Sequence, residues 1–234
     1  MNEEIDKLHI SLINKGSAVE YRIDLDKILY LESQGNRTII HKEREEHIDG
    51  TEIVVAKTLL HFEEKLVGKP FLRIHNSFII NAQKLAKYNK GTKKFVTLVN
   101  GKEIDVSRGR KDILEGNNKI EKHPVPAYDE VIYVDLKSIL YLEAHHDRTE
   151  FHLIIMVEGK PSKTSIFSTK NIGFFEKSLV NKPFFRIHDS YIVNLSKVVK
   201  YYRGSSSGYA VLNTGDGLAV SMGKKDAFLQ YFRR

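Results

Sequence analysis

Residues 69–81 read KPFLRIHNSFIIN, and residues 182–194 read KPFFRIHDSYIVN. Nine of these thirteen positions are identical. Unrelated stretches of this length share about one position, so the chain contains an internal repeat. Three of the four differences keep an apolar side chain, and the fourth exchanges Asn76 for Asp189. The segment therefore keeps its packing in both copies and varies at one polar position, where a function is expected to lie.

The repeat extends on both sides of this segment. Upstream, residues 24–32 (DLDKILYLE) match residues 135–143 (DLKSILYLE). Downstream, the match continues to a Val-Ser pair at 106–107 and again at 220–221, while the offset grows from 111 to 114. We therefore expect two domains of similar fold, because one module is used twice.

The domain boundary is expected where the periodicity of the sequence is lost. Residues 117–127 (NNKIEKHPVPA) contain two prolines and two asparagines and show no strand or helix pattern. This interpretation gives a first domain at residues 1–116, a linker at 117–127 and a second domain at 128–234.

The composition narrows the class of protein. With 41% hydrophobic and 29% charged residues it is ordinary for a soluble globular chain, and no apolar run approaches the length of a membrane span. The N-terminal sequence MNEEIDKLHI is not a signal peptide. The absence of cysteine excludes disulfides, iron–sulfur clusters and thiolate zinc sites, and it fits the reducing cytoplasm in which we expect the protein.

The net charge of +7 indicates a polyanionic partner. The basic residues gather in the last third of each copy. Residues 84–111 hold nine basic and two acidic side chains, and residues 197–225 hold five and one. Because the same region is basic in both copies, a surface for nucleic acid becomes as well supported as an ordinary solvated surface.

Alternating apolar and polar residues predict strands over most of the chain, beginning with a hairpin of residues 8–14 and 18–23. Residues 58–67 (TLLHFEEKLV) instead have apolar residues three and four apart, which predicts a short amphipathic helix. Residues 75–77 are predicted to form a turn, and residues 78–81 a helical turn or a buried apolar plug.

These blocks together resemble the LytTR family of bacterial DNA-binding domains. The resemblance is carried by the F-x-R-I-H-x-S-x-I-x-N segment, the upstream ILYLE block and the V-S-x-x-x-K block near the end of each copy, and it covers about residues 8–115 and 122–233. It implies a mostly β fold with short helices, built as two tandem modules of short antiparallel sheets. Such modules insert loops into successive major grooves of DNA.

The resemblance also has departures. Most family members carry a receiver domain or a membrane sensor, and neither is expected here because the first copy begins close to Met1. Single modules in the family pair by dimerisation. The tandem copies in this chain are expected to take the place of a homodimer.

The resemblance implies DNA contacts from three places in each copy. They are the loop after the ILYLE block, the residue between His and Ser of the central segment, and the element that a serine opens near the end. In copy one these are Gln34, Asn36 and Arg37; Asn76; and Ser107, Arg108, Arg110 and Lys111. In copy two they are His146, Asp147 and Arg148; Asp189; and Ser221, Lys224 and Lys225.

The residue types suit these places in copy one better than in copy two. Asn pairs with adenine and Arg with guanine, while Lys and Ser contact phosphates. In copy two, Asp189 brings a carboxylate to the contact position, and Met222 replaces Arg108. A carboxylate can accept a hydrogen bond from cytosine but is repelled by phosphates, so whether copy two touches bases stays open.

Several residues of the repeat have a structural interpretation. The arginines and histidines of the central segment are expected to orient the following turn, and its final asparagine to cap backbone groups. The tyrosines downstream are expected to pack, with phosphate contact as the alternative. The residues concerned are Arg73, His75, Asn81 and Tyr88 in copy one, and Arg186, His188, Asn194, Tyr201 and Tyr202 in copy two.

Enzymatic readings are weak. His188, Asp189 and Ser190 have the composition of a hydrolytic triad, but adjacent residues cannot converge in the required geometry. The run 145–147 (HHD) does not make a metal site by itself, because no second group of ligands at a suitable spacing supports it. We expect no enzyme, no metal and no cofactor.

The sequence therefore favours a bacterial transcription regulator whose partner is double-stranded DNA, with no membrane association. The alternative is a regulatory module that has lost DNA binding in one or both copies and engages a separate regulator or sensor protein. Asp189, Met222 and the net charge of only +2 in residues 1–116 favour this alternative.

Overall fold

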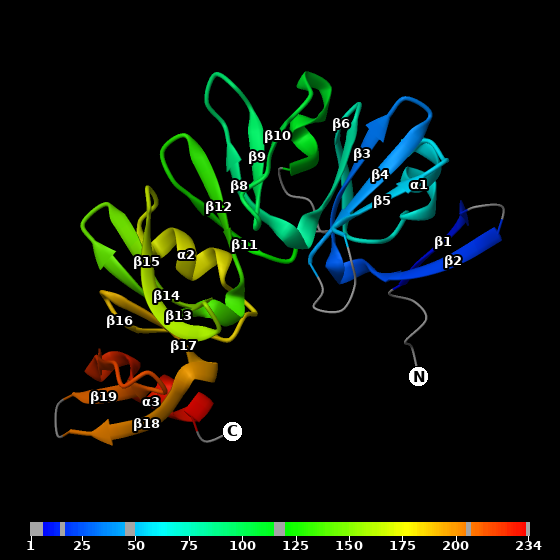
Figure 1. Cartoon of the computed structure of the whole chain (residues 1–234). Helices are drawn as coiled ribbons and strands as arrows, with labels where there is room; N and C mark the ends of the chain where they lie inside the picture. Colours follow the sequence, from blue (N-terminus) through cyan, green and yellow to red (C-terminus); the bar gives the residue numbers. More distant parts are fainter. Residues whose placement is uncertain (1–6, 15–16, 45–49, 115–119, 205–206, 233–234) are drawn as a thin grey trace. The chain divides into compact units, whose positions relative to one another are not determined.

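The computed structural model describes residues 7–14, 17–44, 50–114, 120–204 and 207–232 (Figure 1). It contains mostly strands, arranged in small antiparallel sheets with short helices, as predicted from the sequence. The chain forms two compact units: Met1–His123 with Asp129–Tyr133, and Pro124–Tyr128 with Val134–Arg234. In the described ranges, no helix is both long enough and apolar enough to cross a membrane.

The central sheet of unit 1 has the strand order β5-β4-β3-β7-β6, and its neighbouring strands are antiparallel. Its strands are β3 (Ile28–Gln34), β4 (Arg37–Lys42), β5 (Glu52–Val55), β6 (Phe71–His75) and β7 (Phe78–Asn81). The predicted N-terminal hairpin is present as β1 (Lys7–Asn14) and β2 (Ser17–Asp24), and residues 15–16 at its tip lie outside the described residues.

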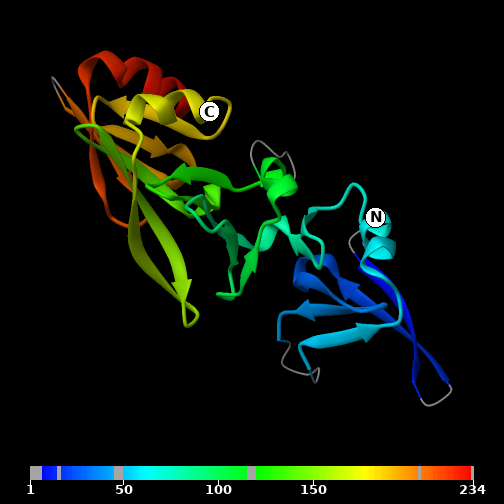
Figure 2. The same ribbon diagram turned by 90° about the horizontal axis from the view of Figure 1, so that it is seen from above.

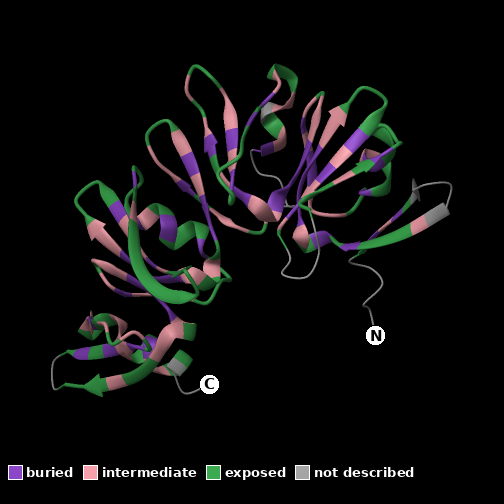
Figure 3. Cartoon of the chain, in the orientation of Figure 1, coloured by how far each residue is buried: buried purple, intermediate pink, exposed green. Residues whose placement is uncertain are grey.

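Strand β7 shows that the prediction of a helical turn for residues 78–81 is wrong, whereas the burial expected in the alternative prediction is confirmed for Ile79 and Ile80. The strand pairs with β3 on one side and β6 on the other. Ile79 packs into a core with helix α1 (Leu59–Lys65), whereas Ile80 packs into a second core on the opposite face. A strand that is buried on both faces reads as a continuous apolar run, and this hides the period of two. Figure 3 colours the buried residues along the strands of the chain in purple.

Helix α1 covers one face of the central sheet. The Thr58 side chain caps its N-terminus by accepting a hydrogen bond from the His61 N–H at 3.4 Å. Leu59, Phe62 and Leu66 are all buried, as the spacing of apolar residues predicted. The helix thereby seals the core that also contains residues of the β1–β2 hairpin.

Asn81 ends β7 and performs the capping role expected of it. Its side chain is fully buried, and its Nδ2 donates to the carbonyl oxygens of Leu25 at 3.1 Å and Ile28 at 2.9 Å. Its Oδ1 accepts from the Gln83 N–H at 3.0 Å. Asn194 makes the corresponding contacts in copy two.

A second sheet covers the other face, and the four of its five strands that belong to unit 1 have the order β10-β9-β8-β12. Its strands are β8 (Leu85–Asn89), β9 (Phe95–Leu98), β10 (Glu103–Asp105) and β12 (Glu130–Val134). Strand β12 lies in the sequence of copy two, yet Val131 pairs with Tyr88 of β8 in an antiparallel register. Tyr88 is buried in this core, as expected.

The region of the expected linker is partly structured. Residues 117–119 lie outside the described residues, and strand β11 (His123–Pro126) follows. The Pro126 carbonyl oxygen accepts hydrogen bonds from the Thr169 N–H at 3.0 Å and the Ser168 Oγ at 2.7 Å, both in unit 2. Along the sequence, residues 124–128 therefore belong to unit 2, residues 129–133 belong to unit 1, and the chain then continues in unit 2.

Unit 2 repeats the architecture. Its central sheet has the order β15-β14-β13-β17-β16, and a smaller sheet has the order β18-β19-β20. The bounds are β13 (Ile139–His145), β14 (Arg148–Val157), β15 (Lys160–Ser168), α2 (Ile172–Ser178), β16 (Phe184–His188), β17 (Tyr191–Asn194), β18 (Val198–Arg203), β19 (Gly208–Leu212), β20 (Gly217–Val220) and α3 (Met222–Phe232). The β14–β15 hairpin is longer than its counterpart β4–β5, and Figure 2 shows it reaching beyond the rest of its sheet.

The packing expected of the downstream tyrosines of copy two holds for one of them. The Tyr201 ring lies 5.4 Å from the Phe228 ring and packs against the core of unit 2. Tyr202 is 60% exposed, so a packing role for it is wrong. Side chains of β18 alternate between the two faces of its sheet, and helix α3 packs on the face that carries Tyr201.

Candidate nucleic-acid interface

The first of the three predicted places is the tight turn between β3 and β4. Gln34 pairs directly with Arg37, which leaves only Gly35 and Asn36 in the turn, and Gly35 has φ +62°. The side chains of Asn36 and Arg37 are exposed. Next to the turn, the Ser33 N–H donates to the Ser77 carbonyl oxygen at 2.9 Å. This bond joins the first place to the second.

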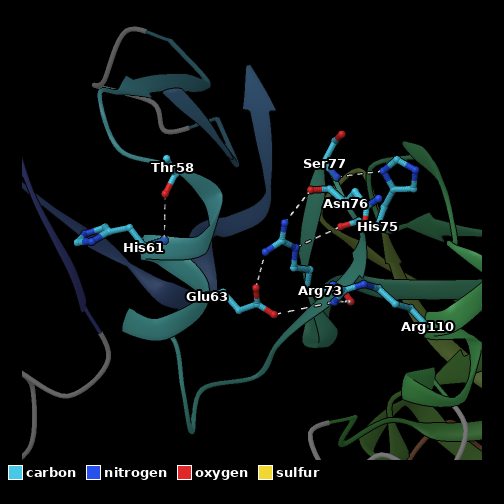
Figure 4. A network of polar contacts seen from close by, with 8 residues as sticks. All are labelled: Thr58, His61, Glu63, Arg73, His75, Asn76, Ser77 and Arg110. Atoms are coloured by element: carbon cyan, nitrogen blue, oxygen red, sulfur yellow. Dashed lines mark hydrogen bonds and ion pairs between the residues drawn. The ribbon is translucent and has the colours of Figure 1, made fainter. Parts of the chain in front are cut away.

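The second place is the turn between β6 and β7, where Asn76 is exposed (Figure 4). Arg73 holds this turn: its Nη2 donates to the Asn76 carbonyl oxygen at 2.8 Å, and its Nη1 contacts Glu63 of α1 at 2.5 Å. His75 Nδ1 accepts from the Ser77 N–H at 3.1 Å. Both side chains therefore orient the turn, as expected, and leave the Asn76 amide free to face solvent.

The third place begins where β10 ends. The Ser107 N–H donates to the Ile74 carbonyl oxygen at 2.9 Å, one residue before the central turn begins. Arg108–Leu114 then forms a 3-10 helix, in which Arg108 is exposed. Arg110 points back, because its Nη1 donates to the Arg73 carbonyl oxygen at 3.0 Å (Figure 4). The side chain of Lys111 lies outside the described residues. The three places thus meet at one end of the central sheet.

Copy two has the same backbone arrangement. The Ala144 N–H donates to the Ser190 carbonyl oxygen, and the Ser221 N–H to the Ile187 carbonyl oxygen, both at 2.9 Å. Arg186 repeats the contacts of Arg73, with its Nη2 donating to the Asp189 carbonyl oxygen at 2.9 Å and its Nη1 2.6 Å from Glu176. The three places of copy two therefore also lie together.

The side chains of copy two differ from those of copy one at these places. His146 takes the position of Gly35 with φ +53°, and Arg148 lies 5.6 Å over the Tyr128 ring. Lys225 donates to the Gly204 carbonyl oxygen at 3.3 Å. Asp147 and Asp189 are exposed carboxylates, so copy two presents more negative charge at its turns than copy one.

A comparison of the sequence with models of protein families agrees with the internal repeat and with the arrangement of the three places in each copy. The model for the LytTr DNA-binding domain matches the chain twice, at residues 19–116 and 129–233. The chain belongs to the LytTR family. Each unit of the structure contains the main sheet of one LytTR match.

A LytTr DNA-binding domain from Bacillus cereus aligns with 48% of this chain and 96% of its own length, at 21% identity and a TM-score of 0.39. The search of curated proteins returned no significant match.

The third place of the first LytTR copy adjoins a basic hollow in the surface. The hollow has a volume of about 670 Å³ and is lined by Thr92, Lys93, Lys94, Asp105, Val106 and Arg108. Its three cations exceed its one carboxylate, although Lys93 contacts Asp105 at 3.3 Å. That ion pair is exposed and therefore weak. The hollow has the size and charge to receive a phosphate group.

Glu63 and Glu176 are the residues of the interface that the sequence interpretation missed. Each lies on the helix of its LytTR copy and fixes the arginine that holds the central turn. Glu63 is also 3.9 Å from Arg110. A signal was present, because Glu63 and Glu176 share the offset of 113 that relates Arg73 to Arg186. A glutamate and an arginine that both recur at the same repeat offset indicate an ion pair that is present in both copies.

Proposed function

We propose that the protein is a bacterial transcription regulator that binds duplex DNA by inserting the turns of its LytTR copies into the major groove. The observation that carries the proposal is the convergence of three separate segments at one end of the central sheet. Two backbone hydrogen bonds, Ser33 to Ser77 and Ser107 to Ile74, hold the segments together in copy one. A rigid group of exposed turns can enter a groove without the entropic cost of ordering loops.

The roles of the side chains follow from their exposure and chemistry. Asn36, Arg37, Asn76 and Arg108 are exposed at the turns of copy one and are proposed to contact bases or the adjacent phosphates. Ser107, Lys111 and the lysines of the basic hollow are proposed as phosphate contacts. Arg110 is proposed to brace the interface, because its guanidinium group is hydrogen-bonded to the Arg73 carbonyl oxygen.

The tandem arrangement is proposed to replace a homodimer. Two binding modules in one chain make the second contact intramolecular, which raises the overall affinity without new contacts. Copy one is proposed to supply most of the sequence preference. In copy two, Asp147, Arg148, Asp189, Ser221, Lys224 and Lys225 are proposed to lie near the DNA backbone, where Asp189 limits affinity.

The experiment that tests the proposal is selection of bound sequences from a random pool of duplex DNA, followed by titration of the selected site. We expect enrichment of a defined motif and stoichiometric binding of one chain to one site. A pool that stays random after several rounds, together with no shift of any fragment, would favour a protein-interaction module instead.

A further inference from the structure

Four potential metal ligands lie together on one face of the β13–β14 hairpin in unit 2. Glu143 and His145 come from β13, and Glu150 and His152 come from β14. The His152 Nε2 is 3.1 Å from the Glu143 Oε2 and 3.6 Å from the Glu150 Oε2, and the His145 Nε2 is 2.9 Å from the same Glu150 oxygen. The side chains are 15–44% exposed, so an ion can reach them from solvent.

The spacing of these atoms suits a small cation. Zinc binds imidazole nitrogen and carboxylate oxygen at about 2.0–2.1 Å, so a tetrahedral arrangement places its ligand atoms about 3.3 Å apart. The three measured separations lie on both sides of this value. One ligand atom each from Glu143, Glu150 and His152 lies within 4.8 Å of the other two, so these three groups already surround a position for one ion. His145 contacts Glu150 and has to turn its ring toward this position to become the fourth ligand.

Strand register makes the cluster unusual as a purely structural feature. Glu143 and Glu150 are directly opposite each other in the antiparallel pair. Like charges at such positions destabilise a sheet unless a cation lies between them.

The first LytTR copy has only two of the four ligands, so its hairpin can be compared with that of copy two. Its Glu32 and His41 have the positions of Glu143 and His152, with Nε2 3.0 Å from Oε2. Gln34 and Ile39 stand where copy two has His145 and Glu150. The two additional ligands are therefore specific to copy two, although the fold of the hairpin does not require them.

Neighbouring side chains orient the ligands. The Tyr141 ring stacks on His152, with centroids 4.1 Å apart and an interplanar angle of 14°. The Tyr191 hydroxyl donates to the Glu143 Oε1 at 3.2 Å and leaves Oε2 for the ion. Such outer contacts are typical of metal sites, where they fix the orientation of the ligands.

We propose that Glu143, His145, Glu150 and His152 form a site for one divalent transition-metal ion of the zinc type. Two imidazoles and two carboxylates are a donor set for Zn²⁺ rather than for Ca²⁺ or Mg²⁺, which prefer oxygen ligands alone. The run 145–147 contributes only His145. The second group of ligands comes from the strands on either side of the turn, and folding brings it within reach of His145.

The test is titration of the full chain with Zn²⁺ by calorimetry, and with Co²⁺, whose visible absorbance reports the nitrogen and oxygen ligands. We expect saturation at one ion per chain. The double variant His145→Gln with Glu150→Ile carries the residues that copy one has at these positions, so the hairpin is expected to fold. It should lose the saturable binding and the Co²⁺ absorbance.

Two further variants sharpen the result. Tyr191→Phe introduces the residue of copy one, Phe78, and should weaken Zn²⁺ binding by about tenfold through loss of the contact to Glu143. His41→Gln should leave the affinity unchanged, because the pair in copy one lacks the other two ligands. Circular dichroism checks the fold of each variant. Absence of saturable binding to the wild-type chain, or full binding by the double variant, overturns the proposal.

Discussion

The Ser107 N–H donates to the carbonyl oxygen of Ile74 at 2.9 Å. This bond connects the start of the C-terminal element to the last strand residue but one before the central turn, and Ser221 repeats it with Ile187 in copy two. Because the bond is made by main-chain atoms, it does not depend on the side chains that contact a ligand. The module can therefore vary its turns while it keeps them together.

DNA binding is expected to weaken steeply with salt. The basic stretches of both copies are the physical reason, since each neutralised phosphate releases counterions. If about six to ten phosphates are contacted, the association constant should fall by about three to five decades between about 50 and 200 mM salt. Titrations of a fluorescent duplex at a series of salt concentrations measure the slope. A flat response would count against a phosphate-based interface.

Asn76→Ala is expected to weaken binding to the selected site by about 1–3 kcal/mol and to relax the preference at one base pair. Its amide is exposed at the tip of the turn, and its carbonyl oxygen is already held by Arg73. The matched control is Lys94→Ala in the basic hollow, which should weaken all sequences about equally. Unchanged base preference in Asn76→Ala would show that this residue reads no base.

The charge of the residue at the tip of the central turn, Asn76 or Asp189, should determine which copy contributes more to DNA affinity. In the full chain, Asn76→Asp is expected to lower DNA affinity by at least about tenfold, because a carboxylate then faces phosphates. The reciprocal change Asp189→Asn is expected to raise the affinity a few-fold, for the same reason. Competition titrations against the selected site compare the two. If Asp189→Asn weakens binding instead, Asp189 accepts a hydrogen bond from a cytosine amino group.

Arg73→Ala should destabilise copy one and abolish specific binding together. The change removes hydrogen bonds to the turn and leaves Glu63 with Arg110 alone, at 3.9 Å. A loss of about 1.5–3 kcal/mol in the free energy of unfolding is expected, because the bonds involve a charged donor. Urea denaturation measures it. Arg37→Ala is the control, since an exposed arginine should change stability by less than about 0.5 kcal/mol.

A fragment of residues 1–133 should be more stable than a fragment of residues 1–116. The longer fragment keeps β12, whose Val131 and Tyr133 are buried in the core of unit 1, and the Tyr133 hydroxyl donates to the Leu114 carbonyl oxygen. Burial of each large apolar side chain contributes about 1.5–3 kcal/mol, so a difference of at least about 3 kcal/mol is expected in urea. Equal stability would show that β12 is not needed for this unit.

Stability at high pH should depend on Tyr141. Its pKa is raised to about 12, mainly by burial, from the ordinary value of 10.0. A raised folded pKa means that the protonated phenol is favoured in the folded state, so this contribution is fully present below pH 10 and is lost between pH 10 and 12. Tyr141→Phe should flatten the fall in unfolding free energy over that range. Burial also raises the pKa of Tyr30 and Tyr191, so tyrosinate absorbance of the wild-type chain should show several late-titrating groups, and Tyr141→Phe should remove the latest of them.

Much of the fold and the interface follows from the sequence alone. The repeat predicts two copies, and spacing predicts the helix at 58–67 because a side-chain period is a local property of the chain. The Arg73 and His75 contacts to the turn were also predictable, since each residue lies within four positions of the backbone that it holds. Identical residues at the repeat offset mark the groups that both copies need.

The tertiary structure decided what depends on distant parts of the chain. Residues 78–81 form a strand because separate cores cover both faces, and no local pattern reveals a second core. Strand β12 pairs in unit 1 although it follows the linker in sequence, because β8 offers it a free edge there. The cluster of Glu143, His145, Glu150 and His152 likewise depends on strand register, which only pairing across the turn establishes. Sequence spacing determines periodic elements, whereas folding determines which of their faces and edges meet.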